Sequence, residues 1–116
     1  MFARSLHMYL KNDGALSFKE KIEGEVIPLL RQQTGFLEHI AFLYLNHREV
    51  ETFSLWASAE HAEAYNRTTY PKILRMLASV IEGSPRVRTF EVLSSTAHAM
   101  SPAVWVQPLS VDYSLL

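Results

Sequence analysis

The chain has 116 residues, no cysteine, and a formal net charge of −1 from 11 basic and 12 acidic residues. This length is that of one domain with a proper core, and the lack of cysteine excludes disulfides and thiolate metal sites and fits a reducing compartment. The scattered Lys and Arg form no basic stripe of the kind that nucleic acid requires. No apolar run approaches the roughly 20 residues that span a bilayer, and residues 1–10 lack a signal-peptide pattern. We therefore expect a cytoplasmic protein without nucleic-acid or membrane partners.

The N-terminal part of the sequence predicts a strand followed by a helix. Residues 2–10 alternate with a period of two, which is typical of a strand. Ser17 and Glu20 form the pattern of a capping box, in which a serine side chain caps the first helical turn. Apolar residues then recur at every third or fourth position, so one side of this helix is expected to face a core.

Proline and glycine predict an interruption and an end of this first helix. Pro28 has no N–H for the Gly24 carbonyl, and its ring crowds that carbonyl. We therefore expect a kink or break between these two residues. Gly35 can adopt the left-handed conformation that commonly ends a helix, so the helix is expected to stop there.

Residues 36–45 predict a strand with two apolar faces, interrupted only by Glu38 and His39. The polar residues 46–49 that follow are typical of a hairpin loop, and residues 50–57 again alternate with a period of two. These two strands are therefore expected to form an antiparallel pair.

The second hairpin strand ends on Trp56, where the pattern changes from strand to helix. Ser58 can cap the helix that follows, and Glu60 lies near the positive end of that helix. Two interpretations of Trp56 stay open at this point. It is either a buried core aromatic whose indole N–H finds an acceptor, or a wall of a pocket.

The last part of the chain predicts a second helical segment and a closing strand. Pro71 fits the first turn of a helix, and Gly83 with Pro85 is expected to end that helix. Residues 87–96 are rich in β-branched and aromatic residues and predict the last strand. The order βαββαβ is typical of an α+β, ferredoxin-like fold, a four-stranded antiparallel sheet with both helices on one face.

The helix-free face of this sheet is predicted to be apolar, because residues 36–45 carry apolar side chains on both sides. Large apolar surfaces mark partner sites, and a second copy related by a twofold axis is the simplest partner. We therefore expect a homodimer through this face. The apolar, proline-interrupted residues 97–116 are expected to lie across the partner or over a cavity, with a loosely ordered end as the alternative.

The order of elements and several local features resemble the antibiotic biosynthesis monooxygenase family. These features are a Pro-Leu-Leu segment before a Gly-Phe junction, and a strand-end tryptophan followed by serine, glutamate and tyrosine: Pro28, Leu29, Leu30, Gly35, Phe36, Trp56, Ser58, Glu60 and Tyr65. The resemblance implies a dimeric α+β barrel, in which two sheets face each other and each subunit holds a cavity between sheet and helices. It divides the chain into a family-like domain, residues 1–98, and a C-terminal extension, residues 99–116.

The resemblance also implies a range of activities. The superfamily includes oxygenases that act on aromatic polyketides without metal or flavin, haem-degrading enzymes, and domains of unknown activity. For this chain the implied function is a monooxygenase without cofactor, acting on a small aromatic, quinol- or anthrone-like molecule beside Trp56. Such a substrate is electron-rich, so a base and a dry aromatic pocket suffice. A non-catalytic ligand-binding or structural dimer is the alternative from another class.

Histidine is the natural base for this chemistry, because it titrates near neutral pH. The candidate bases are His7, His39, His61 and His98. His39 is preferred because it is a polar residue in an otherwise apolar strand, although a satisfied core or surface histidine is the alternative for each. The predicted catalytic residues are His39, Trp56 and His7, and the predicted ligand contacts are Trp56, Tyr65, Tyr70, His61 and Phe42.

Haem degradation and metal binding receive less support from the sequence. By resemblance, haem-degrading relatives pair the tryptophan with an asparagine on the first strand and an iron-ligating histidine on the next helix. Here the first strand offers Ser5 and His7, and the helix position is Asn66. The histidines and glutamates form neither an HExxH motif nor a histidine-rich cluster, so no metal site and no cofactor are predicted.

Overall fold

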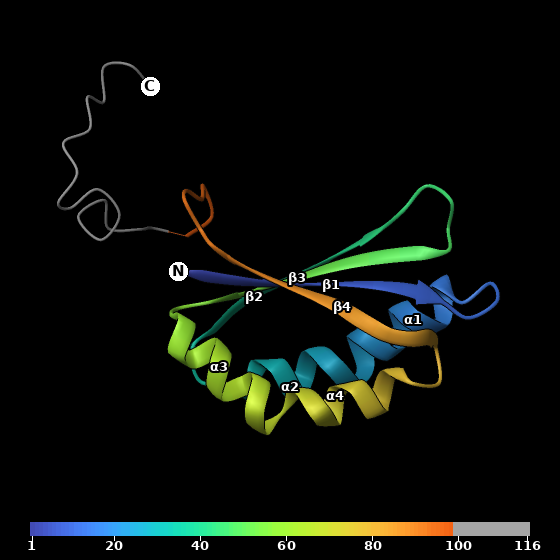
Figure 1. Ribbon diagram of the computed structural model, residues 1–116, viewed down its shortest axis with the longest axis horizontal. Helices are drawn as coiled ribbons and strands as arrows, with labels where there is room; N and C mark the ends of the chain where they lie inside the picture. Colours follow the sequence, from blue (N-terminus) through green and yellow to red (C-terminus); the bar gives the residue numbers. More distant parts are fainter. Residues whose placement is uncertain (99–116) are drawn as a thin grey trace, which may run out of the picture.

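The computed structural model describes residues 1–98, a four-stranded sheet with its helices on one face (Figure 1). The strands are β1 Phe2–Leu10, β2 Phe36–Leu43, β3 Glu49–Trp56 and β4 Ile81–Glu91, which pair in antiparallel fashion in the order β2-β3-β1-β4. The helical segments are α1 Ala15–Lys21, the π-helical η1 Ile22–Val26, α2 Ile27–Arg31, α3 Ala59–Thr68 and α4 Tyr70–Leu77. The predicted α+β, ferredoxin-like βαββαβ arrangement is therefore confirmed.

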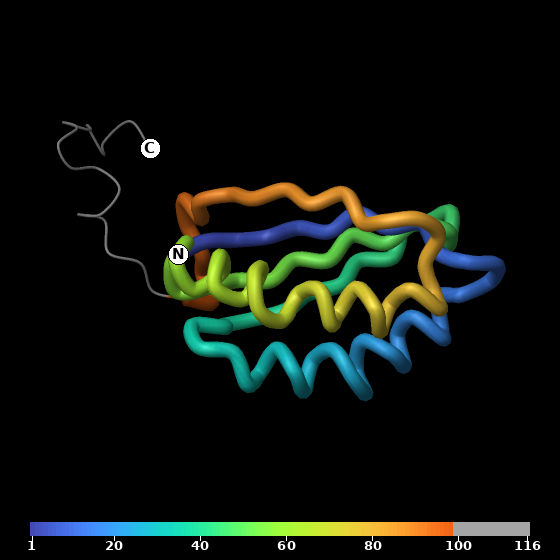
Figure 2. The backbone as a smooth tube through the Cα atoms, turned by 60° about the horizontal axis from the view of Figure 1, so that its bottom comes forward, coloured from blue at the N-terminus to red at the C-terminus, as the bar shows by residue number. Residues whose placement is uncertain are grey.

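The core lies between the sheet and two helical arms. Figure 2 shows the α1–α2 arm beside the α3–α4 arm, with β2 on the side of the first arm and β4 at the opposite edge. The predicted apolar stripe of the first arm is buried, and it meets buried residues of β1 and α4: Phe18, Ile22, Val26, Leu30, Met8, Leu10, Ile73 and Leu77. Burying each large side chain of this kind contributes about 1.5–3 kcal/mol, so this layer holds the two arms to the sheet.

The first helical arm differs from its prediction at its start and in its middle. It begins at Ala15 after Gly14, which makes no side-chain cap, so the predicted capping box at Ser17 is wrong. The predicted interruption before Pro28 is present as the π-helical segment η1, in which the Ile27 N–H bonds to the Ile22 carbonyl. A π-helical turn accommodates the proline without breaking the arm, because it shifts the hydrogen-bond partners by one residue.

The β2–β3 hairpin contains a bulge that sequence periodicity does not reveal. The register shifts between Phe36 and Glu38, which puts one extra residue, Leu37, into β2. Phe36 therefore lies on the helix side against Trp56, and not with Ile40 on the other face as alternation predicts. The strand also ends earlier than predicted, because the turn begins soon after Leu43.

The last strand begins earlier than predicted and also ends earlier. Helix α4 stops at Leu77, and β4 runs from Ile81 to Glu91, so Gly83 lies inside a strand and does not end a helix. Its φ of +64° accompanies a register shift between His7 and Tyr9 of β1. Glycine accepts this conformation at little cost, which explains why it stands at the irregularity.

No helix within residues 1–98 is long and apolar enough to cross a bilayer. The predicted C-terminal extension, residues 99–116, lies outside the described residues, and so does its predicted contact with a partner or a cavity.

Candidate functional site

Trp56 is fully enclosed at the junction of β3 and α3. Its side chain is 0% exposed, its ring centroid lies 4.6 Å from that of Tyr65 and 5.6 Å from that of Phe36, and its Nε1 donates a 2.9 Å hydrogen bond to Ser54 Oγ. This is the packing of a core aromatic whose polar atom is satisfied. Its predicted role as a pocket wall and catalytic residue stays a prediction.

Arg4 is a buried cation that the strand pattern does not mark as a site residue. It is 5% exposed, although β1 places it among apolar residues on the helix side of the sheet. Its Nη2 donates a 3.0 Å hydrogen bond to Asn66 Oδ1 on α3, and its guanidinium lies 4.5 Å from the ring centroid of Tyr70 and 5.3 Å from that of Tyr65. Two predicted ligand contacts, Tyr65 and Tyr70, thus surround a cation. The available signal was a charged residue at an apolar position of the strand pattern.

Both tyrosines beside Arg4 stay protonated over the physiological range. Burial raises the pKa of Tyr65 and of Tyr70, and the charge of Arg4 offsets only part of this rise. Desolvation disfavours a phenolate even next to a guanidinium when the ring is deeply buried. These phenols can therefore serve as hydrogen-bond donors, but not as bases.

A cavity of about 590 Å³, called the Arg4 cavity below, lies between α3 and the strands β1 and β4. Apolar side chains of Phe2, Ala62 and Val87 form part of its wall. Its polar lining comes from both layers and includes Arg4, Glu60, Glu63, Asn66, Arg67 and Thr89. The cavity thus combines a buried cation with apolar surface, a common arrangement in small-molecule sites.

A groove of about 600 Å³, called the His39 groove below, lies between the first helical arm and β2. Most of its lining is apolar, and it includes two predicted site residues, His39 on the helix side of β2 and Phe42, which the strand register places on the helix-free face. Burial lowers the pKa of His39, so its imidazole is neutral at neutral pH. A neutral imidazole beside an apolar groove is available as a base.

A small inner cavity of about 20 Å³ lies between the two larger spaces, with room for about one water molecule. His39 lines both this cavity and the His39 groove, and Arg4 lines both this cavity and the Arg4 cavity. Thr52 and Ser54 of β3 and Tyr65 of α3 add polar atoms to its wall. The interior between sheet and helices is therefore polar along a line that joins the two flanks.

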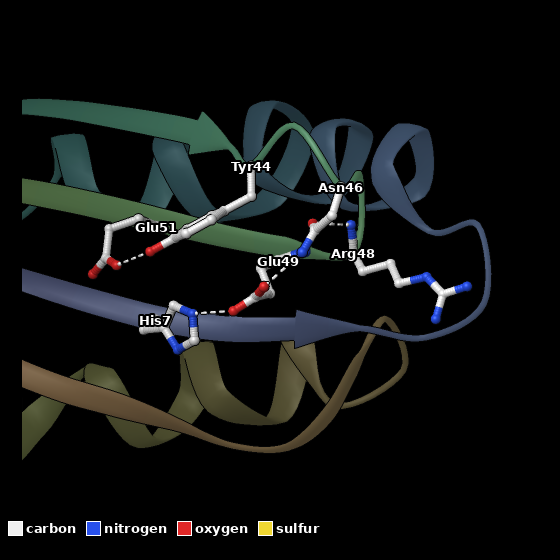
Figure 3. A network of polar contacts seen from close by, with 6 residues as sticks. All are labelled: His7, Tyr44, Asn46, Arg48, Glu49 and Glu51. Atoms are coloured by element: carbon white, nitrogen blue, oxygen red, sulfur yellow. Dashed lines mark hydrogen bonds and ion pairs between the residues drawn. The ribbon is translucent and has the colours of Figure 1, made fainter.

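His7, another predicted catalytic residue, lies on the opposite, helix-free face of the sheet. Its Nε2 is 2.8 Å from Glu49 Oε1, and Glu49 also accepts a 2.6 Å hydrogen bond from Asn46 Nδ2 (Figure 3). The hydrogen bond from Asn46 lowers the pKa of Glu49, and the contact with His7 lowers it further by a smaller amount. Tyr44 donates to Glu51 in the same network. His7 thus belongs to a surface network at the hairpin end and lines neither large cavity.

The remaining candidate histidines have structural contacts. His61 Nδ1 lies 2.9 Å from Ser58 Oγ, and Ser58 Oγ also accepts the His61 N–H as the predicted cap of α3. The His61 ring packs on Gly35, where an added Cβ would lie 2.3 Å from His61 Cγ. His98 Nε2 lies 2.9 Å from a carboxylate oxygen of Glu38. Within residues 1–98, no group of three or more acidic or histidine side chains is arranged to hold a metal ion.

No family model and no curated protein matches the sequence. Solved structures do match. A monooxygenase from the gene ActVA-Orf6 of Streptomyces coelicolor, in complex with the ligand nanaomycin D, is 14% identical over 84% of this chain and 92% of its own, with a TM-score of 0.70. SnoaB, a cofactor-independent oxygenase from Streptomyces nogalater, is 8% identical over 84% of this chain and 97% of its own, with a TM-score of 0.68.

A third neighbour has no known function. NE2512 from Nitrosomonas europaea is 16% identical over 85% of this chain and 95% of its own, with a TM-score of 0.69. At such identities a structural likeness establishes the fold and leaves the activity open. The chain therefore has the fold of the antibiotic biosynthesis monooxygenases, which its sequence features indicated.

Proposed function

We propose that the protein is a monooxygenase that acts without a cofactor on a small aromatic, quinol- or anthrone-like molecule bound in the His39 groove. The observation that carries the proposal is the neutral imidazole of His39 beside an apolar groove. Two structures with this fold are described as a monooxygenase and a cofactor-independent oxygenase. The volume of about 600 Å³ suits a small aromatic molecule, since such sites measure about 300–1,000 Å³.

The proposed reaction needs a base, a dry site and dioxygen. His39 removes a proton from the methylene carbon of an anthrone, which lies opposite the carbonyl in the central ring, and this leaves an electron-rich anion. The anion reduces dioxygen and forms a carbon–oxygen bond, and the proton held by His39 passes to the outer oxygen, giving a hydroperoxide at that carbon. His39 then takes the second hydrogen of that carbon as a proton while the oxygen–oxygen bond breaks. That proton passes to the leaving hydroxide, so the products are the quinone and one water molecule. The apolar lining favours proton removal at carbon by excluding bulk water.

Oxygen consumption with anthrone as substrate tests this proposal. In His39→Gln we expect kcat to fall by about 10²–10⁴-fold, the usual contribution of a general base. In the wild type, kcat/KM should rise with pH through a pKa below the ordinary value of histidine, because burial disfavours the imidazolium.

Two further variants complete this experiment. His47→Gln is the matched control, because His47 also lines the groove but is exposed in the hairpin loop. Trp56→Phe tests the predicted role of Trp56. This variant should reduce turnover less than His39→Gln does. Equal turnover in His39→Gln and wild type would remove His39 from the mechanism.

Ligand binding without turnover is the second candidate function, and the inner cavity favours it. This cavity of about 20 Å³ is too small for an aromatic ring. An aromatic ligand in the His39 groove therefore reaches the polar side chains beyond His39 only if the core opens. Calorimetric titration with anthraquinone distinguishes the two functions when read together with the oxygen assay. Binding of anthraquinone, together with no enzymatic oxygen consumption when an anthrone is added, supports the non-catalytic function.

Haem handling does not fit the residues present. The helix position that haem-degrading relatives use for iron holds Asn66, whose oxygen accepts a hydrogen bond from Arg4. The nearest histidine on α3, His61, is bonded to Ser58 and packs against Gly35. Neither side chain is placed as a free iron ligand, and a titration with haemin is expected to give no shift of the Soret band.

We further propose that the protein forms a homodimer through the helix-free face. Large apolar side chains on this face are exposed: Tyr9 (52%), Ile40 (39%), Phe42 (52%), Tyr44 (41%) and Phe90 (45%). Surfaces of this kind normally have a partner. The strand registers also place Glu51 of β3, His7 of β1 and Arg86 of β4 in one row. A twofold axis parallel to β1 would set Glu51 against Arg86 of the partner subunit, so the face is complementary to itself.

Light scattering coupled to size exclusion tests the dimer. The wild type is expected to have twice the chain mass of 13.3 kDa, and Phe90→Glu is expected to be a monomer. Leu93→Glu is the control, because Leu93 follows β4 and is exposed outside the sheet. Charge reversal at Glu51 or Arg86 alone should weaken the dimer, and reversal of both should restore it. A wild-type monomer at micromolar concentration would contradict the proposal.

A further inference from the structure

Arg4 is a buried cation without a counter-ion in the described part of the chain. It is 5% exposed, and the ion pairs formed within residues 1–98 do not include it. A guanidinium stays charged at any physiological pH and presents five N–H donors. Burying such a group is costly unless it is paired. The one protein acceptor within residues 1–98 is neutral, Asn66 Oδ1, and the other donors of Arg4 keep accessible surface, so they are open to a ligand in the cavity that Arg4 lines.

The carboxylates that line the Arg4 cavity are engaged elsewhere. Glu63 pairs with Arg67 one helical turn away, at 3.7 Å. Glu60 is held at the start of α3, where its own backbone N–H and then Ser58 lower its pKa. The four charged side chains of the lining, Arg4, Arg67, Glu60 and Glu63, therefore sum to zero, but only Arg4 is buried and lacks a carboxylate partner.

The guanidinium of Arg4 is held in place by two aromatic rings. The rings of Tyr70 and Tyr65 lie against the guanidinium at 4.5 and 5.3 Å and fix its position. Because Arg4 only donates, the oxygen of the Asn66 amide faces it, and the amide NH₂ remains a donor. Thr89 adds a hydroxyl to the same cavity, and Phe2 and Val87 add apolar wall.

We propose that the Arg4 cavity binds the carboxylate of a small organic acid whose apolar body packs against Phe2 and Val87. The buried guanidinium supplies the charge and a planar pair of donors, and the Asn66 amide supplies a further donor. A monoanion fits better than a phosphate dianion, because the cavity wall also carries Glu60 and Glu63. This site lies at the edge of the sheet opposite the His39 groove, and it does not depend on the proposed oxygenase reaction.

Calorimetry and NMR titration of the whole chain with benzoate test the proposal, with benzamide as the uncharged analogue and inorganic phosphate as the other anion. The decisive variant is Asn66→Asp, which places a carboxylate of the same shape next to Arg4 and so supplies the missing anion within the protein. This variant is expected to fold and to unfold at a higher temperature than the wild type, but to bind benzoate at least about tenfold more weakly. Asn12→Asp adds the same charge in an exposed turn and should change neither property.

Binding of benzoate but not benzamide, lost in Asn66→Asp and kept in Asn12→Asp, supports the proposal. Equal binding of benzoate and benzamide would overturn it, as would equal benzoate binding by wild type and Asn66→Asp, or no benzoate binding by the wild type. Binding of phosphate in place of benzoate would overturn the assignment to carboxylates. None of these measurements requires turnover of anthrone, so they can fail or succeed independently of the oxygen assay.

Discussion

The His39 groove and the Arg4 cavity occupy opposite flanks of the same fold and have nearly the same volume, about 600 and 590 Å³. Each contains a partly or fully buried basic side chain close to the small inner cavity. The first is lined mainly by apolar residues, whereas the second has charged residues of both signs. The two flanks therefore differ in which cationic side chain is buried, an imidazole or a guanidinium.

Burial has opposite chemical consequences for His39 and Arg4. The imidazole responds by losing its charge, since desolvation lowers the pKa of His39 and leaves a neutral base. The guanidinium cannot lose its proton and must instead find partners. This difference underlies the two proposed roles, proton removal from an apolar substrate on one flank and binding of an anion on the other.

The largest expected difference between the flanks concerns stability at Trp56, which packs against Tyr65 behind Arg4. Trp56→Ala should lower the free energy of unfolding by about 3–5 kcal/mol, because it empties a fully buried site. Leu16→Ala, at an exposed position beside the His39 groove, is the control and should cost far less. Urea unfolding followed by circular dichroism measures both. A small loss in Trp56→Ala would mean that the core near Arg4 is not closely packed.

A second expected effect concerns the partner of Arg4. Asn66→Leu should destabilise the protein by about 1–3 kcal/mol, since it leaves a buried guanidinium without its acceptor. The neighbouring Arg67→Leu removes an exposed ion pair with Glu63 and should cost little. Thermal unfolding of the two variants gives the comparison. Equal stability of both variants would show that Arg4 does not need Asn66.

A third, smaller effect separates the helices that wall the two sites. Ser58→Ala removes the cap of α3 and should cost about 1 kcal/mol. Ser17→Ala is the control, since Ser17 lies inside α1 and Gly14 precedes that helix without a side-chain cap. Urea unfolding of both variants tests this difference. A larger cost at Ser17 would restore the predicted capping box.

The smallest expected effect is the pH dependence contributed by His39. Above about pH 6.5 the imidazole is neutral in both the folded and the unfolded chain. As the pH falls below this value, the unfolded chain takes up the proton first, so stability decreases until the folded imidazole is also protonated. His39→Gln should therefore lose less stability than the wild type between about pH 7.5 and about pH 5.5. Unfolding curves at both pH values, with His47→Gln as the control, measure this. Identical pH dependence in wild type and His39→Gln would contradict the lowered pKa.

The candidate site could be predicted only in part from the sequence. The strand pattern predicts His39 and Phe42 as site residues, and both line the same groove. The pattern does not predict Arg4 as a site residue, because an arginine in an alternating segment usually points to solvent. Its partner Asn66 is 62 positions away in the chain. The placement of His7 on the other face also required the strand register, since a histidine between apolar neighbours fits either face.

The sequence by itself determined the kinds and order of the elements, the apolar stripe of the first helical arm and the cap at Ser58, because periodicity and capping act over a few residues. The tertiary structure decided where β4 begins, which residues of β2 face the helices, and which side chains meet around Arg4. Those features depend on a bulge, a strand register and the packing of an arm against a sheet. They join residues that are distant in the chain, and local patterns contain no information about such contacts.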